Sequence, residues 1–215
     1  MVRHRIARLA SLVVLFAAPA FSQTLHDVAK RVNDHYNHLN SLEAKYTERY
    51  SGMGMNKTET GTLLLKKPGK MRWSYAAPEG KLFVLDGKNA YFYTPGDAQA
   101  QVIPAKKLDD MRSPLRFLLG HTNLEKELDH LTMNSSGDRA YFTGVPKGME
   151  ERVKEFTVAV QAATGAILGL KVEEIDGSTT EFTFSALKEN VPVKDSDFTF
   201  TPPVGVEIVS GMPPV

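Results

Sequence analysis

The chain has 215 residues, of which 26 are Lys or Arg and 25 are Asp or Glu, so its formal net charge at pH 7 is +1. This balance argues against a nucleic-acid partner and against strong binding to anionic lipid. Cysteine is absent, which excludes disulfides, thiolate metal sites and thiol nucleophiles.

The first 22 residues are typical of a secretory signal peptide. Arginines at residues 3–8 precede an apolar stretch, residues 9–18, that is too short to span a bilayer. Small residues at 20–22 favour cleavage before Gln23, with residues 18–20 as the alternative. We therefore expect export and one mature domain over residues 23–215; an N-terminal membrane anchor is the second interpretation.

Residues 24–40 carry apolar side chains at steps of three and four, which predicts an amphipathic helix. From residue 42 the pattern changes to alternation, which predicts a strand over residues 42–50. The run Gly52–Asn56 predicts a hairpin loop after that strand.

Short apolar runs separated by turn sequences follow, and they predict consecutive strands. Asp86-Gly87-Lys88-Asn89 lies between two of these runs and is typical of a tight hairpin turn. In this half of the chain, strands are expected near residues 57–67, 70–76, 81–86, 89–94 and 99–104.

Residues 106–120 break the strand pattern. Ser113 followed by Pro114 is typical of a helix start and Gly120 of a helix end, so we expect a short helix over residues 114–119. Strands resume near residues 141–145, 153–162, 166–175, 179–187 and 198–201.

The later strands alternate between apolar and polar residues, as Phe182 and Phe184 do with their polar neighbours. Such alternation is typical of an antiparallel sheet with one buried face. The sequence therefore predicts a mainly β fold with helices: a single, strongly curved antiparallel sheet, either closed into a barrel or unclosed. The inside of the curve can bury the apolar faces of the helices.

Catalytic motifs such as G-x-S-x-G, H-E-x-x-H and phosphate-binding loops are absent, so we expect neither an enzyme nor a cofactor. His35 and His38 have a spacing that two metal ligands can use, but a solvated helix face explains it better, and we expect no metal. Glu173 and Glu174 are adjacent in a predicted strand and point to opposite faces, which excludes a shared acid–base pair.

The remaining feature is apolar surface on the strands that begin at Gly61. Side chains that share a face within a strand include Met71 with Trp73, and Tyr91 with Tyr93. Adaptable Met and amphipathic aromatic residues suit the wall of a ligand cavity, but the same pattern fits residues that simply fill a core. As candidate cavity residues we select Leu63, Leu65, Met71, Trp73, Tyr91, Tyr93, Leu115 and Leu118.

Four motifs in order along the chain resemble a known family. They are G-x-L-x-x-K-K-P-x-K-x-R-W-x-Y-x-x-P from Gly61, L-F-V-L-D-G-K-x-x-Y-F-Y-x-P from Leu82, S-P-L-R-F-L-L-G from Ser113 and D-F-T-F-x-P-P-x-G-V-E from Asp197. Each is weak alone, but together they resemble the periplasmic outer-membrane lipoprotein carrier (LolA-like) family.

The resemblance implies an unclosed β-barrel whose helices form a lid over an apolar cavity for the acyl chains of a lipoprotein. It implies a carrier, expected to be a monomer in the periplasm, that takes cargo from an inner-membrane lipoprotein-releasing ABC transporter and delivers it to an outer-membrane lipoprotein receptor. Because the chain has no cysteine to carry a lipid, it fits the shuttle rather than the anchored receptor. A periplasmic lipid- or lipoprotein-sensing regulatory module of similar fold is the alternative.

The chain departs from the family at two positions. The family's K-R-P motif has an Arg that holds the empty lid closed, and this place is taken by Lys67. A lysine cannot reproduce the planar fork of an arginine, so a weaker or different lid latch is expected. A family Phe linked to cargo handling aligns with Met71.

Overall fold

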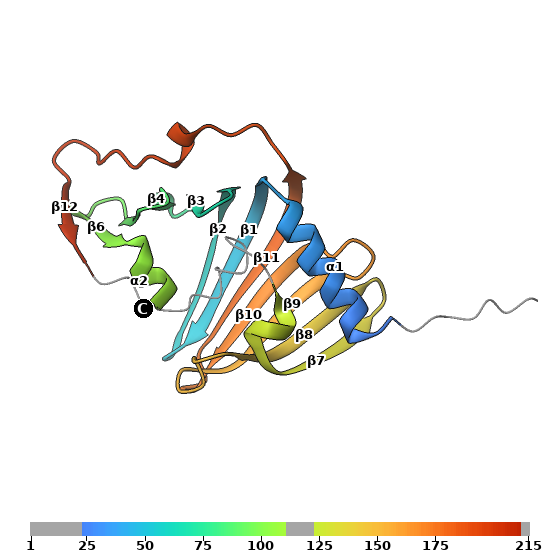
Figure 1. The fold of residues 1–215 in the computed structure, drawn as a ribbon. Helices are drawn as coiled ribbons and strands as arrows, with labels where there is room; N and C mark the ends of the chain where they lie inside the picture. Colours follow the sequence, from blue (N-terminus) through green and yellow to red (C-terminus); the bar gives the residue numbers. More distant parts are fainter. Residues whose placement is uncertain (1–22, 111–122, 212–215) are drawn as a thin grey trace, which may run out of the picture.

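The computed structural model describes residues 23–110 and 123–211 (Figure 1). The predicted signal peptide and the predicted helix over residues 114–119 therefore lie outside the described residues.

Within the described residues, twelve strands form one sheet. They are β1 (Ser41–Gly52), β2 (Met55–Lys66), β3 (Lys70–Ala77), β4 (Glu79–Leu85), β5 (Asn89–Tyr93), β6 (Gln99–Pro104), β7 (Leu128–Ser136), β8 (Arg139–Pro146), β9 (Val153–Gln161), β10 (Ile167–Glu174), β11 (Thr179–Glu189) and β12 (Glu207–Ser210).

The order of the strands in the sheet is β12-β6-β5-β4-β3-β2-β1-β11-β10-β9-β8-β7. Every neighbouring pair is antiparallel except β12 and β6, which run parallel. The terminal strands β12 and β7 lie at opposite ends of this order, so the sheet is open, and Figure 1 shows that it curves strongly. The expected unclosed, curved sheet is confirmed.

Helix α1 (Leu25–His38) lies across the face of β9, β10 and β11 (Figure 1). It begins at a capping box in which the Thr24 side chain accepts from the Asp27 backbone N–H and Asp27 bonds back to Thr24. The shorter helices are α2 (Ala105–Asp110) and α4 (Leu124–Glu127), and η1 (Asp195–Phe198) is a 3-10 turn. In the part of the chain that the structure describes, no helix is both long and apolar enough to cross a membrane.

The two faces of the sheet carry separate apolar clusters. On the inner face, buried residues of α1, among them Val28 and Val32, pack against inward side chains of the strands. On the outer face of β4–β6, a smaller cluster is covered by Phe200 from the C-terminal segment. That segment is held by Arg72, which donates to the carbonyl oxygens of Asp197 and Thr199. The large inner cluster is the core of the domain.

Several sequence expectations need correction. The strand predicted at residues 198–201 is absent, because Asp197 accepts from the Lys194 backbone N–H and turns the chain into η1. Strand β7 was not predicted; a register shift between Asp129 and Thr132 interrupts its alternation. Helix α2 and the parallel strand β12 were also not predicted.

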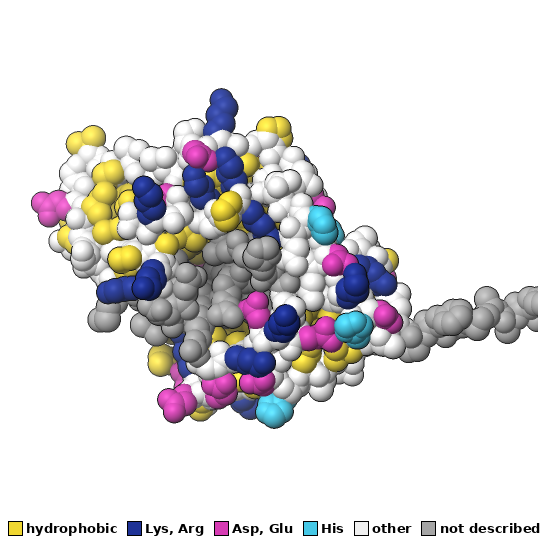
Figure 2. Space-filling model, in the orientation of Figure 1, with side chains coloured by type: hydrophobic (Ala, Val, Ile, Leu, Met, Phe, Trp, Pro, Cys, Tyr) yellow, Lys and Arg dark blue, Asp and Glu magenta, His cyan; other side chains and the backbone are white. Residues whose placement is uncertain are grey.

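Figure 2 shows how charge is distributed on the face that Figure 1 presents. Acidic and basic side chains are interspersed along its lower part, whereas hydrophobic side chains gather over the β5–β6–β12 region at the upper left. This mixing agrees with the nearly balanced charge of the sequence.

Candidate functional site

An aromatic wall lines the inner face of the sheet around Trp73. The ring of Trp73 lies 4.5 Å from that of Tyr46 and 5.3 Å from that of Phe182, measured between centroids. Phe184 follows at 6.2 Å from Trp73, and Tyr75 lies 5.5 Å from Tyr46. Because β1, β3 and β11 place these residues on one face by alternation, aromatic side chains from three strands meet there.

Four of the predicted cavity residues belong to this wall or to the layer beside it. Register pairs Leu63 with Trp73 and Leu65 with Met71 across β2 and β3. All four side chains are buried, and the Trp73 indole N–H donates to the Met71 sulfur at 2.7 Å. The structure therefore brings these four residues together on the inner face; their contact with a lipid remains a prediction.

Tyr91 and Tyr93 lie elsewhere, so their assignment to the same cavity is wrong. Across the β4–β5 hairpin, Leu85 pairs with Ala90 on the inner face, which turns Tyr91 and Tyr93 outward. There they pack against Phe200, with ring centroids at 5.3 and 6.2 Å respectively. Leu115 and Leu118, the other two candidates, lie outside the described residues.

Helix α1 covers the part of the inner face that lies next to the start of β1. Its buried residue Tyr36 places its hydroxyl where it accepts a hydrogen bond from the Ile167 backbone N–H at 3.1 Å. Burial raises the pKa of Tyr36 well above its usual value, so the hydroxyl stays neutral. At the edges of the helix, His35 pairs with Glu189 at 2.9 Å and His26 with Glu125 at 3.0 Å. Side-chain contacts thus fix α1 over the cluster.

Lys67 reaches the C-terminal end of α1 from the end of β2. Its ammonium group donates to the carbonyl oxygen of Tyr36, and its backbone N–H donates to the Asn40 carbonyl at 2.8 Å. A cation is favourable there because the last carbonyls of a helix carry partial negative charge. Burial lowers the pKa of Lys67. The position predicted to hold a lid therefore contacts a helix that covers the inner face, and the latch role stays a prediction.

A charged group of residues at the other end of the inner face was missed by the sequence analysis. Glu48 and Glu59 face each other across β1 and β2, and Glu59 is almost fully buried. Two ammonium groups contact Glu59, that of Lys57 at 2.7 Å and that of Lys81 at 2.6 Å. The alternation in β1 could have indicated it: residues 42, 44 and 46 face inward, and residue 48 is the next one on that face.

The two carboxyl groups titrate differently. Burial raises the pKa of Glu48, and the neighbouring Glu59 carboxylate raises it further. Burial also acts to raise the pKa of Glu59, but Lys57 and Lys81 outweigh this effect and hold that pKa below its usual value. Glu59 is therefore the anchored anion of the group, and Glu48 is the carboxyl that gains a proton more easily.

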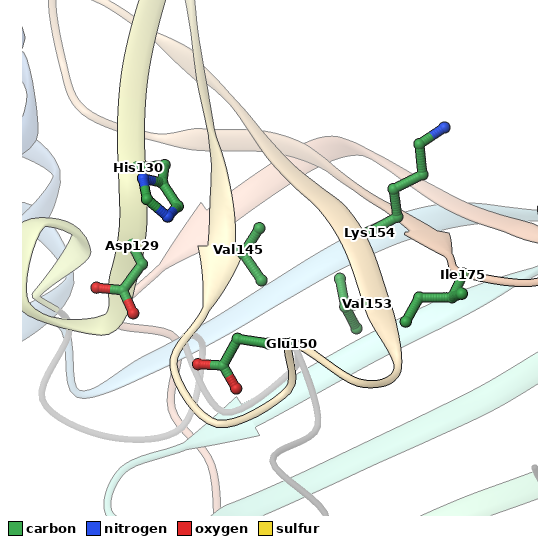
Figure 3. Close-up of a pocket in the computed structure, with 7 residues that line it drawn as sticks. All are labelled: Asp129, His130, Val145, Glu150, Val153, Lys154 and Ile175. Atoms are coloured by element: carbon green, nitrogen blue, oxygen red, sulfur yellow. The ribbon is translucent and has the colours of Figure 1, made fainter.

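A pocket of about 390 Å³ lies at the β7–β10 end of the sheet (Figure 3). Its charged residues already have partners: Lys154 pairs with Glu173, Asp129 with Lys147, and Glu150 accepts from the Gly148 backbone N–H. The pocket shares no residue with the aromatic wall. Its lining residues are Asp129, His130, Val145, Glu150, Val153, Lys154 and Ile175.

His35 and His38, whose spacing two metal ligands could use, do not converge on one point. His35 contacts Glu189, whereas the His38 Nδ1 lies 2.7 Å from the Asp34 carbonyl oxygen. Across residues 23–110 and 123–211, no group of three His, Cys, Asp or Glu side chains is arranged to hold a metal ion.

The open curved sheet carries a large apolar cluster on its inner face, and helix α1 packs against it. Residues 37–201 match the family described as outer membrane lipoprotein carrier protein LolA. The chain belongs to this family of lipoprotein carriers, which confirms the resemblance seen in its motifs.

Named relatives cover nearly the whole chain. The outer-membrane lipoprotein carrier protein of Sodalis glossinidius is 32% identical over 196 residues, which cover 90% of this chain and 91% of that protein. The carrier protein of Pseudoalteromonas translucida is 28% identical over 198 residues, covering 90% of each. Among solved structures, an uncharacterized conserved protein from Thermus thermophilus aligns with a TM-score of 0.57 at 11% identity, over 88% of this chain and 100% of that one. This last likeness concerns the fold alone.

Proposed function

We propose that this chain is a periplasmic carrier that binds the acyl chains of lipoproteins on its inner face and moves them from the inner to the outer membrane. The observation that supports it most is the aromatic wall around Trp73, which belongs to the apolar cluster against which α1 packs. The family match over residues 37–201 supports lipoproteins as the class of cargo.

The energetics explain why a helical cover is needed. Each buried CH₂ of an acyl chain contributes about 0.8 kcal/mol, so a lipid with several chains has a large driving force for entering the wall. An uncovered wall would expose a large apolar patch to water. Helix α1 buries Val28, Val32 and Tyr36 against the inner face. Cargo chains would replace these contacts, and re-covering by α1 would favour their release.

The donor and acceptor follow from the direction of transport. An ABC transporter of the inner membrane would supply the lipoprotein, and an outer-membrane lipoprotein receptor would receive it. The chain carries no cysteine to which a lipid could be attached, which suits the member that moves between the two. Cleavage before Gln23 would free the chain from its export signal.

The direct test is cargo capture. The mature chain is mixed with a purified triacylated lipoprotein in detergent, the detergent is removed, and the mixture is separated by size-exclusion chromatography. We expect a soluble one-to-one complex, and the same lipoprotein without its acyl chains serves as the control. Precipitation of the lipoprotein in the presence of the chain would overturn the proposal.

A second stage separates a carrier from a lipid-sensing regulator. The isolated complex is added to membranes that contain an outer-membrane lipoprotein receptor, and the lipoprotein is followed by sedimentation. A carrier delivers the lipoprotein to the receptor-bearing membranes and returns to its cargo-free form. Stable retention of the cargo with no delivery would favour the regulatory module instead.

A further inference from the structure

The aromatic wall ends in polar groups on the side away from the Lys67 contact. Tyr46, next to Trp73, is followed along β1 by the inward-facing Glu48. Tyr75 on β3 reaches the same place, and its hydroxyl donates a long hydrogen bond of 3.4 Å to Glu48. The ammonium group of Lys81 on β4 lies 4.3 Å from the centre of the Tyr75 ring. The inner face therefore changes from apolar around Trp73 to polar at this end. We call Tyr46, Glu48 and Tyr75 the polar end.

The Tyr46 hydroxyl lacks a good partner. Its oxygen is buried and makes no hydrogen bond of ordinary geometry with the described residues. The neighbouring Tyr75 hydroxyl gives it only a weak polar contact. A buried hydroxyl that forms no hydrogen bond is unfavourable, so the position suits an incoming acceptor. Gly61 allows the hydroxyl to lie there, because a Cβ at this position would lie 2.7 Å from the Tyr46 oxygen.

The surroundings of the polar end are charge-balanced. The carboxylates of Glu48 and Glu59 are matched by the ammonium groups of Lys57 and Lys81, and both lysines already contact Glu59. A phosphate group would therefore meet the Glu48 carboxylate while the nearby cations are engaged. An uncharged group with acceptor oxygens meets phenol O–H donors without this repulsion.

We propose that the polar end is a subsite for the uncharged, carbonyl-bearing part of an acylated ligand, in which an ester oxygen accepts a hydrogen bond from the Tyr46 hydroxyl. The chains of that ligand lie along the wall past Trp73, while the single hydroxyl proton of Tyr75 stays with Glu48. The inference rests on the proposed carrier function and adds to it a direction: the head of the lipid lies at the polar end.

The test uses the only tryptophan of the chain as its reporter, since Trp73 lies beside Tyr46. The mature chain is titrated with two lipids that have the same chains, dioctanoylglycerol with ester carbonyls and the dioctylglycerol ether without them. We expect the wild-type chain to bind the ester about fivefold more tightly, the equivalent of one net hydrogen bond of about 1 kcal/mol. Dioctanoyl phosphatidic acid should bind more weakly than dioctanoylglycerol.

The variants Tyr46→Phe and Tyr75→Phe isolate the hydroxyl groups. Tyr46→Phe should lose most of the ester preference, whereas Tyr75→Phe should keep it, because the Tyr75 hydroxyl is engaged with Glu48. Both variants should keep the wild-type affinity for the ether. Tyr46→Phe should also be as stable as the wild type or more so, because its hydroxyl has no good partner in the cargo-free chain. Tyr36→Phe is the matched stability control: it leaves the Ile167 N–H without its acceptor and should be less stable.

The outcomes separate the two proposals. Equal wild-type affinity for ester and ether, an unchanged preference in Tyr46→Phe, or tight binding of the phosphatidic acid would overturn the subsite and leave the carrier function standing. Failure of the wild-type chain to bind either glycerolipid would overturn the carrier function and the subsite with it.

Discussion

The chain buries aromatic side chains on both faces of its sheet, but it covers them differently. On the outer face, Phe200 packs against Tyr91 and Tyr93, and the segment that carries it continues into β12, which pairs with β6 through the backbone. On the inner face, α1 packs against the large cluster to which Trp73 belongs, and side chains such as Lys67 and His35 hold it there.

This difference gives the two clusters different roles. The cover of the outer cluster is part of the sheet, whereas the cover of the inner cluster can be replaced. Removing the outer cover means breaking strand pairing, whereas moving α1 requires breaking a few side-chain contacts and replacing its apolar area. A lipid chain can supply that area. The outer cluster should therefore govern stability, and the inner cluster should govern binding.

The largest effect on stability is expected from Phe200→Ala. Phe200 is buried in the outer cluster, and removing such a ring should lower the free energy of unfolding by about 3 kcal/mol. Urea unfolding followed by circular dichroism measures this loss. The folded variant should still capture lipoprotein as the wild type does. A loss below about 1 kcal/mol, typical of surface sites, would contradict the structural role of the outer cluster. A loss of capture in the folded variant would contradict the assignment of binding to the inner face.

Phe182→Ala is the inner counterpart. Phe182 is only partly buried, so we expect a loss of about 1–2 kcal/mol in the free energy of unfolding. Removing this ring from the wall should weaken the binding of acylated cargo, which the capture assay measures against Phe200→Ala. If the outer variant loses more cargo than the inner one, the assignment of binding to the inner face is wrong.

Lys67→Leu tests how the inner cover is fixed. The substitution leaves the Tyr36 carbonyl without its ammonium partner and should cost about 1 kcal/mol of helix anchoring. Delivery of cargo to the acceptor should change more than its capture, because α1 must re-cover the face for release. Amide hydrogen exchange in α1 should become faster.

Lys67→Arg is the matched variant for this prediction. It keeps the positive charge at the end of α1 and restores the residue type of the family motif, so slow exchange and normal delivery should return. Unchanged delivery in the leucine variant would show that Lys67 has no latch role.

The fold could be predicted largely from local patterns. β6 has the expected bounds, and the steps of three and four in residues 24–40 correspond to α1 (Leu25–His38). The outward direction of Tyr91 could not be predicted locally, because Tyr91 and Phe92 are both aromatic and either could face inward. The choice depends on Phe200, which comes from a distant part of the chain.

The polar end was missed for a different reason. Its register follows from the position of one turn: Met53 and Gly54 have positive φ values of 50° and 74° and form a two-residue turn between β1 and β2. With the turn placed there, Glu48 and Glu59 are opposite by counting outward. The loop predicted over Gly52–Asn56 is longer than this turn, so the sequence pattern alone does not place the two carboxyl groups opposite each other.

The smallest expected effect concerns the charge at the polar end and its dependence on pH. Burial raises the pKa of Glu48, so the folded chain binds that proton more tightly than the unfolded chain. Ionisation of Glu48 therefore lowers stability as the pH rises from the ordinary carboxyl pKa through the raised one, and the full cost is present above it. Glu48→Gln removes this cost and should be more stable than the wild type at pH 7, by roughly 0.5 kcal/mol.

The gain should vanish near about pH 4, where the wild-type carboxyl is already protonated. Glu59→Gln is the control with the opposite sign: Lys57 and Lys81 lower the Glu59 pKa against the effect of burial, so its charge adds stability above the unfolded pKa and loses it as the pH falls. Urea unfolding of both variants, at pH 7 and at the acidic pH, measures the two changes in stability. A Glu48→Gln variant less stable than the wild type at pH 7 would mean that Lys81 and the Tyr75 hydroxyl stabilise the Glu48 carboxylate by more than burial destabilises it, which is the opposite of the expected balance.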